Sequence, residues 1–319
     1  MAYPAQLQAA IEREVGAVDR TRLASAAARI TATYKEGRFH GALDSAESRA
    51  AYLITRLPAT FAANLQVFRE VAQFADLIPS SLLDLGAGPG TAMWAAREVW
   101  PSLPLFRLVE NNANFLQLGK RLAGESADTE WFQSDIAQMP EFPASDLVVL
   151  SYVVGELKNP VNVVERAWAA ARKALVVIEP GTPRNFAVIA DLRRQLIELG
   201  GHMIAPCPHS QDCPMSAAND WCHFSVRLAR SSEHRRLKGG ALGYEDEKFS
   251  YLAFSKSPVQ TNFARIIRHP LVHSGHIQLK LCTANGLQSR TVTRSEKQPF
   301  RAARNAKWGD RWDENAQLE

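Results

Sequence analysis

A glycine-rich turn between an apolar run and a helix-like segment constrains the fold of this chain more than any other feature. Residues 81–91 read Ser-Leu-Leu-Asp-Leu-Gly-Ala-Gly-Pro-Gly-Thr, with Asp84 ahead of Gly86, Gly88 and Gly90. A strand that runs into such a turn, followed at once by a helix, lets the backbone approach a bound ligand closely. The next predicted strand, 106–110, ends in Glu110, where a carboxylate can accept hydrogen bonds from ribose hydroxyls. This context predicts a nucleotide-type ligand at the carboxyl end of a Rossmann-like sheet.

Strands and helices alternate through the middle of the chain. Strands are predicted at residues 81–85, 106–110, 131–135, 146–151 and 174–179, and helices at 92–99, 115–122, 161–171 and 191–199. The continuous apolar run at 146–151 is typical of a strand buried on both faces. This alternation predicts an α/β fold with a doubly wound parallel sheet.

The ends of the chain have other patterns. Apolar residues recur three and four positions apart before residue 78, which predicts helices, with Pro58 breaking or kinking one of them. After residue 200 short alternating segments predict antiparallel strands, and Asn285-Gly286 is a turn signal between two of them. We therefore predict a helical region (1–78), a Rossmann-like ligand-binding domain (79–200), a cysteine-ligated metal and β-strand region (201–296) and a basic tail (297–319).

The cysteines predict one metal centre. The chain has four: Cys207, Cys213, Cys222 and Cys282. Neighbouring thiolates are costly unless a metal neutralises them, and four ligands match either a structural zinc or a four-iron cluster. The gaps of five and eight residues between the first three fit a paired-cysteine zinc motif poorly. His209 and His223 are alternative ligands.

The location of the protein is predicted from what the sequence lacks. The first residues contain no secretory signal, and no window approaches the roughly 18 apolar residues of a membrane span. We therefore expect a cytoplasmic, reducing setting without a membrane partner, which favours metal over disulfides.

Charge is unevenly distributed. Residues 201–319 contain 17 Lys/Arg and 11 Asp/Glu, against 20 and 22 in the first 200 residues. This excess indicates a polyanion partner on the C-terminal third. The candidate RNA-binding residues are Arg227, Arg230, Arg235, Arg236 and Lys238, extended by the tail's Arg301, Arg304, Lys307 and Arg311. If the first run is helical, Arg227 and Arg230 share a face. The alternative is pairing with Glu245, Asp246 and Glu247.

The glycine spacing bears on the identity of the ligand. Thr91 stands where the dinucleotide fingerprint has its third glycine. The pattern instead resembles motif I of class I S-adenosylmethionine (SAM) methyltransferases. That resemblance implies that SAM is held by Asp84, Gly86, Gly88, Gly90, Glu110, Asp135 beside the adenine, and Ser151. A degenerate domain that binds nothing is the alternative. No catalytic residue is assigned, although Tyr152 or Glu156 could act as a base.

Six stretches together resemble one family. They are residues 56–61, 84–90, 151–157, 179–183, 207–224 and 243–251. The chain is similar, from about residue 50 to the Trp308-Gly-Asp310 tail, to the Rsm22 family of ribosomal small-subunit-associated, methyltransferase-like proteins. The resemblance implies a class I SAM-methyltransferase fold and a [4Fe-4S] cluster on the four cysteines. It also implies binding to a maturing small ribosomal subunit through its rRNA, with DNA not expected. An RNA-binding assembly protein without catalytic activity and with a structural zinc is the alternative, and a small-molecule methyltransferase with a metal-stapled lid is a third reading.

Overall fold

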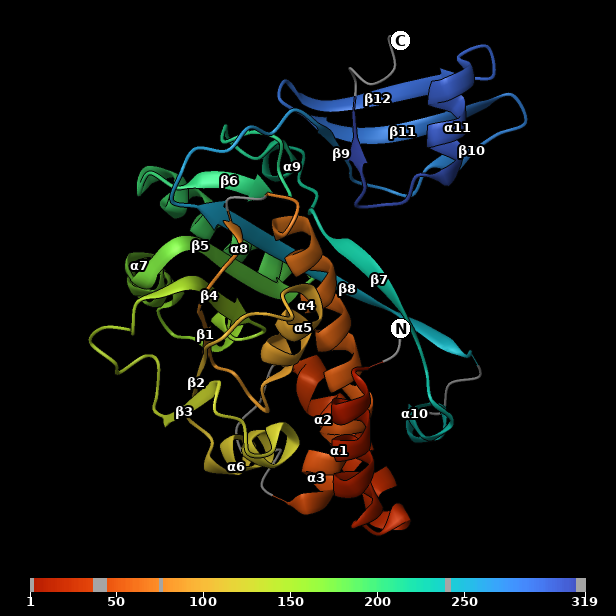
Figure 1. Cartoon of the computed structure of the whole chain (residues 1–319). Helices are drawn as coiled ribbons and strands as arrows, with labels where there is room; N and C mark the ends of the chain where they lie inside the picture. The colour runs from red at the N-terminus through yellow and green to blue at the C-terminus, as the bar shows by residue number, and fades with distance from the viewer. Residues whose placement is uncertain (1–2, 37–44, 75–76, 239–241, 314–319) are drawn as a thin grey trace. The chain divides into compact units, whose positions relative to one another are not determined.

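The computed structural model describes residues 3–36, 45–74, 77–238 and 242–313, and Figure 1 traces its elements. The chain forms two compact units, Met1–Ile178 with Val226–Glu247 and Glu179–Ser225 with Lys248–Glu319. It passes between them within β5 (Ala171–Pro180), β7 (Phe224–Ala229) and β8 (Tyr244–Ser255). The four segments expected from the sequence stay predictions as independent domains.

The first unit contains a parallel sheet with the strand order β3-β2-β1-β4-β5. The strands other than β5 are β1 (Leu82–Leu85), β2 (Phe106–Glu110), β3 (Thr129–Gln133) and β4 (Ser145–Ser151). Leu82 aligns with Phe106 on one side and with Leu147 on the other, and β1 is buried along its whole length. The strand order reverses direction beside β1, which is where a doubly wound sheet binds its ligand.

Helices complete the first unit. They are α1 (Ala5–Gly16), α2 (Arg20–Glu36), α3 (Ala46–Thr55), α4 (Leu57–Val71), α5 (Thr91–Val99), α6 (Ala113–Ala123), η2 (Val154–Glu156), α7 (Pro160–Ala170) and α10 (Ser232–Lys238). Helix α4 packs against α5 and buries Phe61 and Phe68 almost completely. The predicted break at Pro58 is confirmed, because α3 ends at Thr55 and Pro58 lies in the first turn of α4, where its missing N–H costs nothing.

The second unit combines helices with antiparallel strands. Its elements besides the shared strands are α8 (Pro183–Glu198), β6 (His202–Ala205), α9 (Pro214–Ala217), β9 (Ala264–Ile266), β10 (Leu271–Val272), β11 (His276–Thr283), β12 (Gly286–Thr293), α11 (Lys297–Asn305) and β13 (Arg311–Trp312). Strand β6 pairs antiparallel with β8. The small sheet has the order β10-β11-β9-β13, with β12 also paired to β11. The predicted turn at Asn285-Gly286 is confirmed as the β11–β12 connection.

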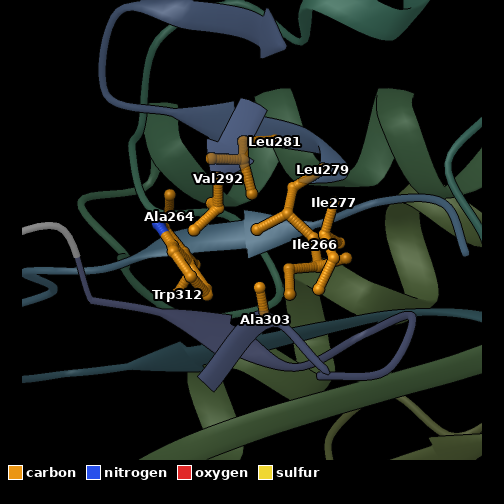
Figure 2. Packing of buried hydrophobic residues seen from close by; sticks show 8 residues of the cluster. All are labelled: Ala264, Ile266, Ile277, Leu279, Leu281, Val292, Ala303 and Trp312. Atoms are coloured by element: carbon orange, nitrogen blue, oxygen red, sulfur yellow. The ribbon is translucent and has the colours of Figure 1, made fainter. Parts of the chain in front are cut away.

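The small sheet has a core of its own, shown in Figure 2. Successive side chains of a strand point to opposite faces, so Ile277, Leu279 and Leu281 of β11 all face this core. Ala303 of α11 and Trp312 of β13 close it. The last segment is therefore more than a basic tail, since it supplies a helix and an edge strand to a packed sheet.

Candidate cofactor site and candidate metal centre

The three glycines of the loop after β1 all have backbone angles that other residues rarely adopt. Their φ values are 78° at Gly86, 54° at Gly88 and 81° at Gly90. A Cβ at Gly86 would lie 2.6 Å from a methyl carbon of Val153, whereas a Cβ at Gly88 would meet no atom within 4 Å. Gly86 is thus required by packing, and Gly88 leaves open space beside the loop.

Glu110 ties the glycine loop to the end of β2. Its carboxylate accepts hydrogen bonds from the backbone N–H groups of Gly88 at 2.8 Å and Asn112 at 2.7 Å. Burial raises the pKa of Glu110, while these hydrogen bonds oppose the rise. The carboxylate therefore lies at the glycine loop, as the sequence predicted, and the loop backbone already occupies part of its accepting capacity.

Asp84 is the second carboxyl group of this site. It is 1% exposed, and its Oδ2 atom is buried without a hydrogen-bond partner. Burial, together with the nearby charge of Glu110, raises the pKa of Asp84 to about 8. A positively charged ligand beside these two carboxyl groups would favour their ionised forms and lower both raised pKa values. SAM carries a positively charged ammonium group and a positively charged sulfonium group, so carboxyl groups at this site fit it as a ligand.

The other predicted SAM contacts lie at the ends of β3 and β4. Asp135 accepts a hydrogen bond from the N–H of Ala137 at 2.9 Å. Ser151 at the end of β4 accepts one from Asn64 Nδ2 of α4 at 2.9 Å. Sequence reasoning did not find Asn64, because a buried asparagine on a helix has no local signal.

Tyr152 follows β4 with an unusual backbone. Its φ is 58°, a strained value for a residue other than glycine. Its hydroxyl donates to Glu247 Oε1 at 2.9 Å, and Glu247 lies 3.8 Å from the guanidinium of Arg56. Tyr152, one of two candidate bases, is thus engaged by Glu247, which the sequence analysis considered only as a partner of the basic run. The other, Glu156, ends η2 and is exposed.

All four cysteines line one cavity of the second unit. Cys207 follows β6, Cys213 precedes α9, Cys222 precedes β7 and Cys282 lies on β11. Three of them also belong to an apolar cluster that includes Phe186 of α8. The predicted convergence of a loop and a distant strand is therefore present in the structure.

The electrostatics of this cavity favour a metal over free thiolates. Burial, followed by the neighbouring cysteines, raises the pKa of Cys282 to about 12 and the pKa of Cys222 well above its ordinary value. Burial also raises the pKa of Cys207. These three thiols of the metal-free chain are thus protonated at neutral pH, and a metal would have to displace their protons.

A single zinc ion and a four-iron cluster require different spacings of their four thiolates. Among the residues that the structure describes, no three His, Cys, Asp or Glu side chains are arranged to hold a metal ion. Around one Zn²⁺, with Zn–S bonds of about 2.3 Å, four sulfurs lie within roughly 4 Å of one another. In a four-iron cluster each thiolate binds its own iron, so the sulfurs lie farther apart.

The two alternative histidine ligands differ in their surroundings. His209 Nε2 lies 3.6 Å from the sulfur of Cys282. His223 is buried, stacks on Trp221 and packs against Trp308. His209 is therefore close enough to orient a ligand, whereas His223 belongs to an aromatic cluster.

The candidate RNA-binding run is only partly helical. Arg227 lies in β7, because Phe224, Val226 and Leu228 alternate inward, and α10 begins only at Ser232. Arg227 and Arg230 therefore share no helical face.

Three of these arginines have acidic partners. Arg227 pairs with Asp246 at 2.7 Å, Arg230 with Glu245 at 2.8 Å and Arg236 with Glu233 at 2.6 Å. Arg235 is exposed, and the side chain of Lys238 lies outside the described residues. The intramolecular pairing considered above is thus present for part of the run.

Three comparisons place the chain among known proteins. A family model described as "Mitochondrial small ribosomal subunit Rsm22" matches residues 46–313. The chain is 28% identical over 286 residues to the human ribosome assembly protein METTL17, mitochondrial, covering 81% of this chain and 61% of that protein. It is 24% identical over 247 residues to the Saccharomyces cerevisiae ribosome assembly protein RSM22, mitochondrial, covering 46% and 39%. The chain thus spans less than two thirds of the length of these relatives.

Solved structures give more distant likenesses. A putative RNA methyltransferase from Pyrococcus horikoshii matches with a TM-score of 0.42 at 14% identity, over 61% of this chain and 84% of that one. Magnesium protoporphyrin IX methyltransferase from Synechocystis matches with a TM-score of 0.41 at 11% identity, over 62% and 84%. At these scores the likeness adds nothing to the strand order and loop geometry described above.

The predicted cytoplasmic location is wrong by this comparison, because all four matching curated relatives are named as mitochondrial proteins. The prediction failed because the lack of a secretory signal does not separate the cytoplasm from the interior of an organelle. No helix within the described part of the chain is long and apolar enough to cross a membrane.

Proposed function

Because the chain belongs to the Rsm22 family, we propose that it is a methyltransferase-like assembly factor of the small ribosomal subunit that binds SAM and a [4Fe-4S] cluster. The observation that carries this proposal is the convergence of four cysteines on one cavity, in a chain whose family match spans residues 46–313. The named relatives are ribosome assembly proteins, which supports the rRNA of the small subunit as the partner.

Cys207, Cys213, Cys222 and Cys282 would hold the cluster. Three come from a loop and the fourth from β11, so ligation would join that loop to the small sheet. Because ligation energy is folding energy, the cluster would stabilise the second unit directly. Its role in this proposal is structural.

SAM would bind at the glycine loop of the first unit. Gly88 offers open space beside the backbone, and a cationic ligand would favour the ionised forms of the Asp84 and Glu110 carboxyl groups. When bound, SAM supplies an activated methyl group. The hydroxyl of Tyr152, however, already donates a hydrogen bond to Glu247. We therefore propose ligand binding, rather than methyl transfer, as the role of this pocket in assembly.

The metal content tests the first part of the proposal. Protein purified without oxygen should contain iron and sulfide, and Cys282→Ser should lose both. The variant should also expose the region after residue 200 to protease while the first unit stays resistant. Protein that retains zinc after iron–sulfur reconstitution would instead support the zinc-containing RNA-binding alternative.

The partner and the ligand are tested separately. The wild-type protein should co-sediment with immature small ribosomal subunits, and Cys282→Ser should do so poorly. Calorimetry with SAM should give saturable binding. If SAM and S-adenosylhomocysteine both fail to bind the intact protein, the pocket is vestigial and the SAM part of the proposal is wrong.

A further inference from the structure

A buried arginine lies on the apolar face of α8. Phe186, Ile189 and Arg193 follow one another at helical spacing, and all three line the cysteine cavity. Arg193 is only 5% exposed. An arginine is fully buried only when something compensates its charge.

The partners of Arg193 do not supply a negative charge. Its Nη2 atom donates to the backbone carbonyl of His209 at 2.8 Å, and its side chain lines the cavity together with Cys207. Its Nε atom is buried without a partner. Among the described residues no carboxylate forms an ion pair with it.

An uncompensated charge at this position is costly. A guanidinium does not deprotonate in proteins, so the chain cannot relieve the cost by neutralising the side chain. Breaking a buried ion pair is strongly destabilising because one charge is left alone. The metal-free chain therefore holds a buried cation, without a carboxylate partner, in the cavity that the four cysteines line.

A metal centre would supply the missing negative charge. Four thiolates carry more negative charge than one Zn²⁺ or the oxidised core of a four-iron cluster carries positive charge, so either centre is a net anion. We propose that Arg193 is a positioning residue that compensates the charge of this thiolate-ligated centre and holds the loop of Cys207 toward it. This inference rests on the proposed function. It implies that the positive charge of Arg193 is compensated only when the cavity holds metal.

Arg265 is a contrasting case in the same unit. It is 1% exposed and donates to the carbonyls of Pro206 at 2.9 Å and Gly309 at 2.6 Å. Those bonds connect β9 to two loops, so replacing Arg265 would disturb the backbone. Arg193 is the better site for a test because its removal disturbs the backbone less.

The test compares Arg193→Met, Arg193→Lys and the control Arg194→Met. Arg194 is the next residue of α8, is well exposed and pairs with Asp191. Each protein is purified without oxygen and challenged with a chelator, and iron, sulfide and zinc are followed over time. Arg193→Met should lose metal on the order of 10–100-fold more readily than wild type, as for other residues that support metal ligands. Arg193→Lys should fall between, and Arg194→Met should match wild type.

Thermal unfolding of the metal-free proteins supplies the readout that separates charge from structure. Removing an uncompensated charge should leave the melting temperature of metal-free Arg193→Met equal to or higher than that of wild type, although its metal-loaded form melts lower. Equal metal retention by Arg193→Met and wild type would overturn the inference alone. A second result would also overturn it: metal-free Arg193→Met melts well below metal-free wild type, and Arg193→Lys loses metal as readily as Arg193→Met. A wild-type protein that binds no metal would overturn both this inference and the metal part of the proposed function.

Discussion

At the scale of single residues, the candidate SAM site is defined by what its groups lack. Asp84 is buried with an unpartnered oxygen, although most buried polar atoms in proteins are hydrogen-bonded. Gly88 borders open space where a side chain would fit. These are features of a site that is completed by a ligand, and each leads to a measurement.

The raised pKa of Asp84 predicts how stability depends on pH. Its pKa is about 8 in the folded chain, against about 3.9 for an unfolded chain. The folded state therefore binds more protons between these values. Protonated Asp84 contributes to the free energy of unfolding, and this contribution is fully present below about pH 4. It is lost as the pH rises toward 8, by at most about 1.4 kcal/mol per pH unit. Denaturant unfolding of the SAM-free protein should show this decline, and Asp84→Asn should flatten it. An unchanged slope in Asp84→Asn would contradict the assignment.

Gly88→Ala tests the loop with a matched control. Gly88 and Gly200 both have positive φ values, and neither Cβ would meet an atom within 4 Å. Alanine at either position should therefore cost about 1–2 kcal/mol of backbone strain. Only Gly88→Ala should also weaken SAM binding, measured by calorimetry, because Gly88 lies in the glycine loop that we propose binds SAM. Equal SAM affinities for the two variants would exclude this loop as the binding site.

At the scale of elements, β11 serves two purposes. Its inward residues form the core of the small sheet, and Cys282 near its end lines the cysteine cavity. Leu279→Ala should lower the unfolding free energy of the second unit by about 2–5 kcal/mol, the usual cost of such a truncation. It should also reduce metal retention, although strand alternation places Leu279 and Cys282 on opposite faces of β11. Lys280→Ala, on the exposed face of the same strand, is the control. Iron retention at the wild-type level in a destabilised Leu279→Ala would contradict the coupling.

Elements were predictable where their own pattern was strong. The predicted strand at 146–151 matches β4 within a residue, and the predicted helix at 161–171 matches α7 equally well, because continuous apolar runs and helical spacing are local signals. Helix α11 was missed since its buried positions include only Pro299 and Ala303 among many charged residues. Asn64 and Arg193 were missed for a different reason: their roles depend on partners far away in the sequence.

At the scale of the whole molecule, the charge excess belongs to a definite part of the chain. Residues 264–312 contain ten Lys/Arg and two Asp/Glu. On α11 the cations Lys297, Arg301 and Arg304 are exposed and recur four and three positions apart, which places them along one face of the helix. Among the described residues none of the three has an acidic partner. These three cations of α11 differ from Arg227 and Arg230, which form ion pairs with Asp246 and Glu245.

That difference predicts which surface binds rRNA. Reversing Arg301 and Arg304 to glutamate should weaken binding to small-subunit rRNA, and the slope of log affinity against log salt should become shallower by about 1 for each phosphate that the protein no longer neutralises. The matched reversal of Arg235 and Arg236 on α10 should have a smaller effect, because Arg236 already pairs with Glu233. Metal content must equal that of wild type in both variants, so that a weaker affinity reports charge and not unfolding. If the α10 variant shows the weaker affinity and the shallower salt slope of the two, the RNA surface lies on the segment first indicated by the sequence.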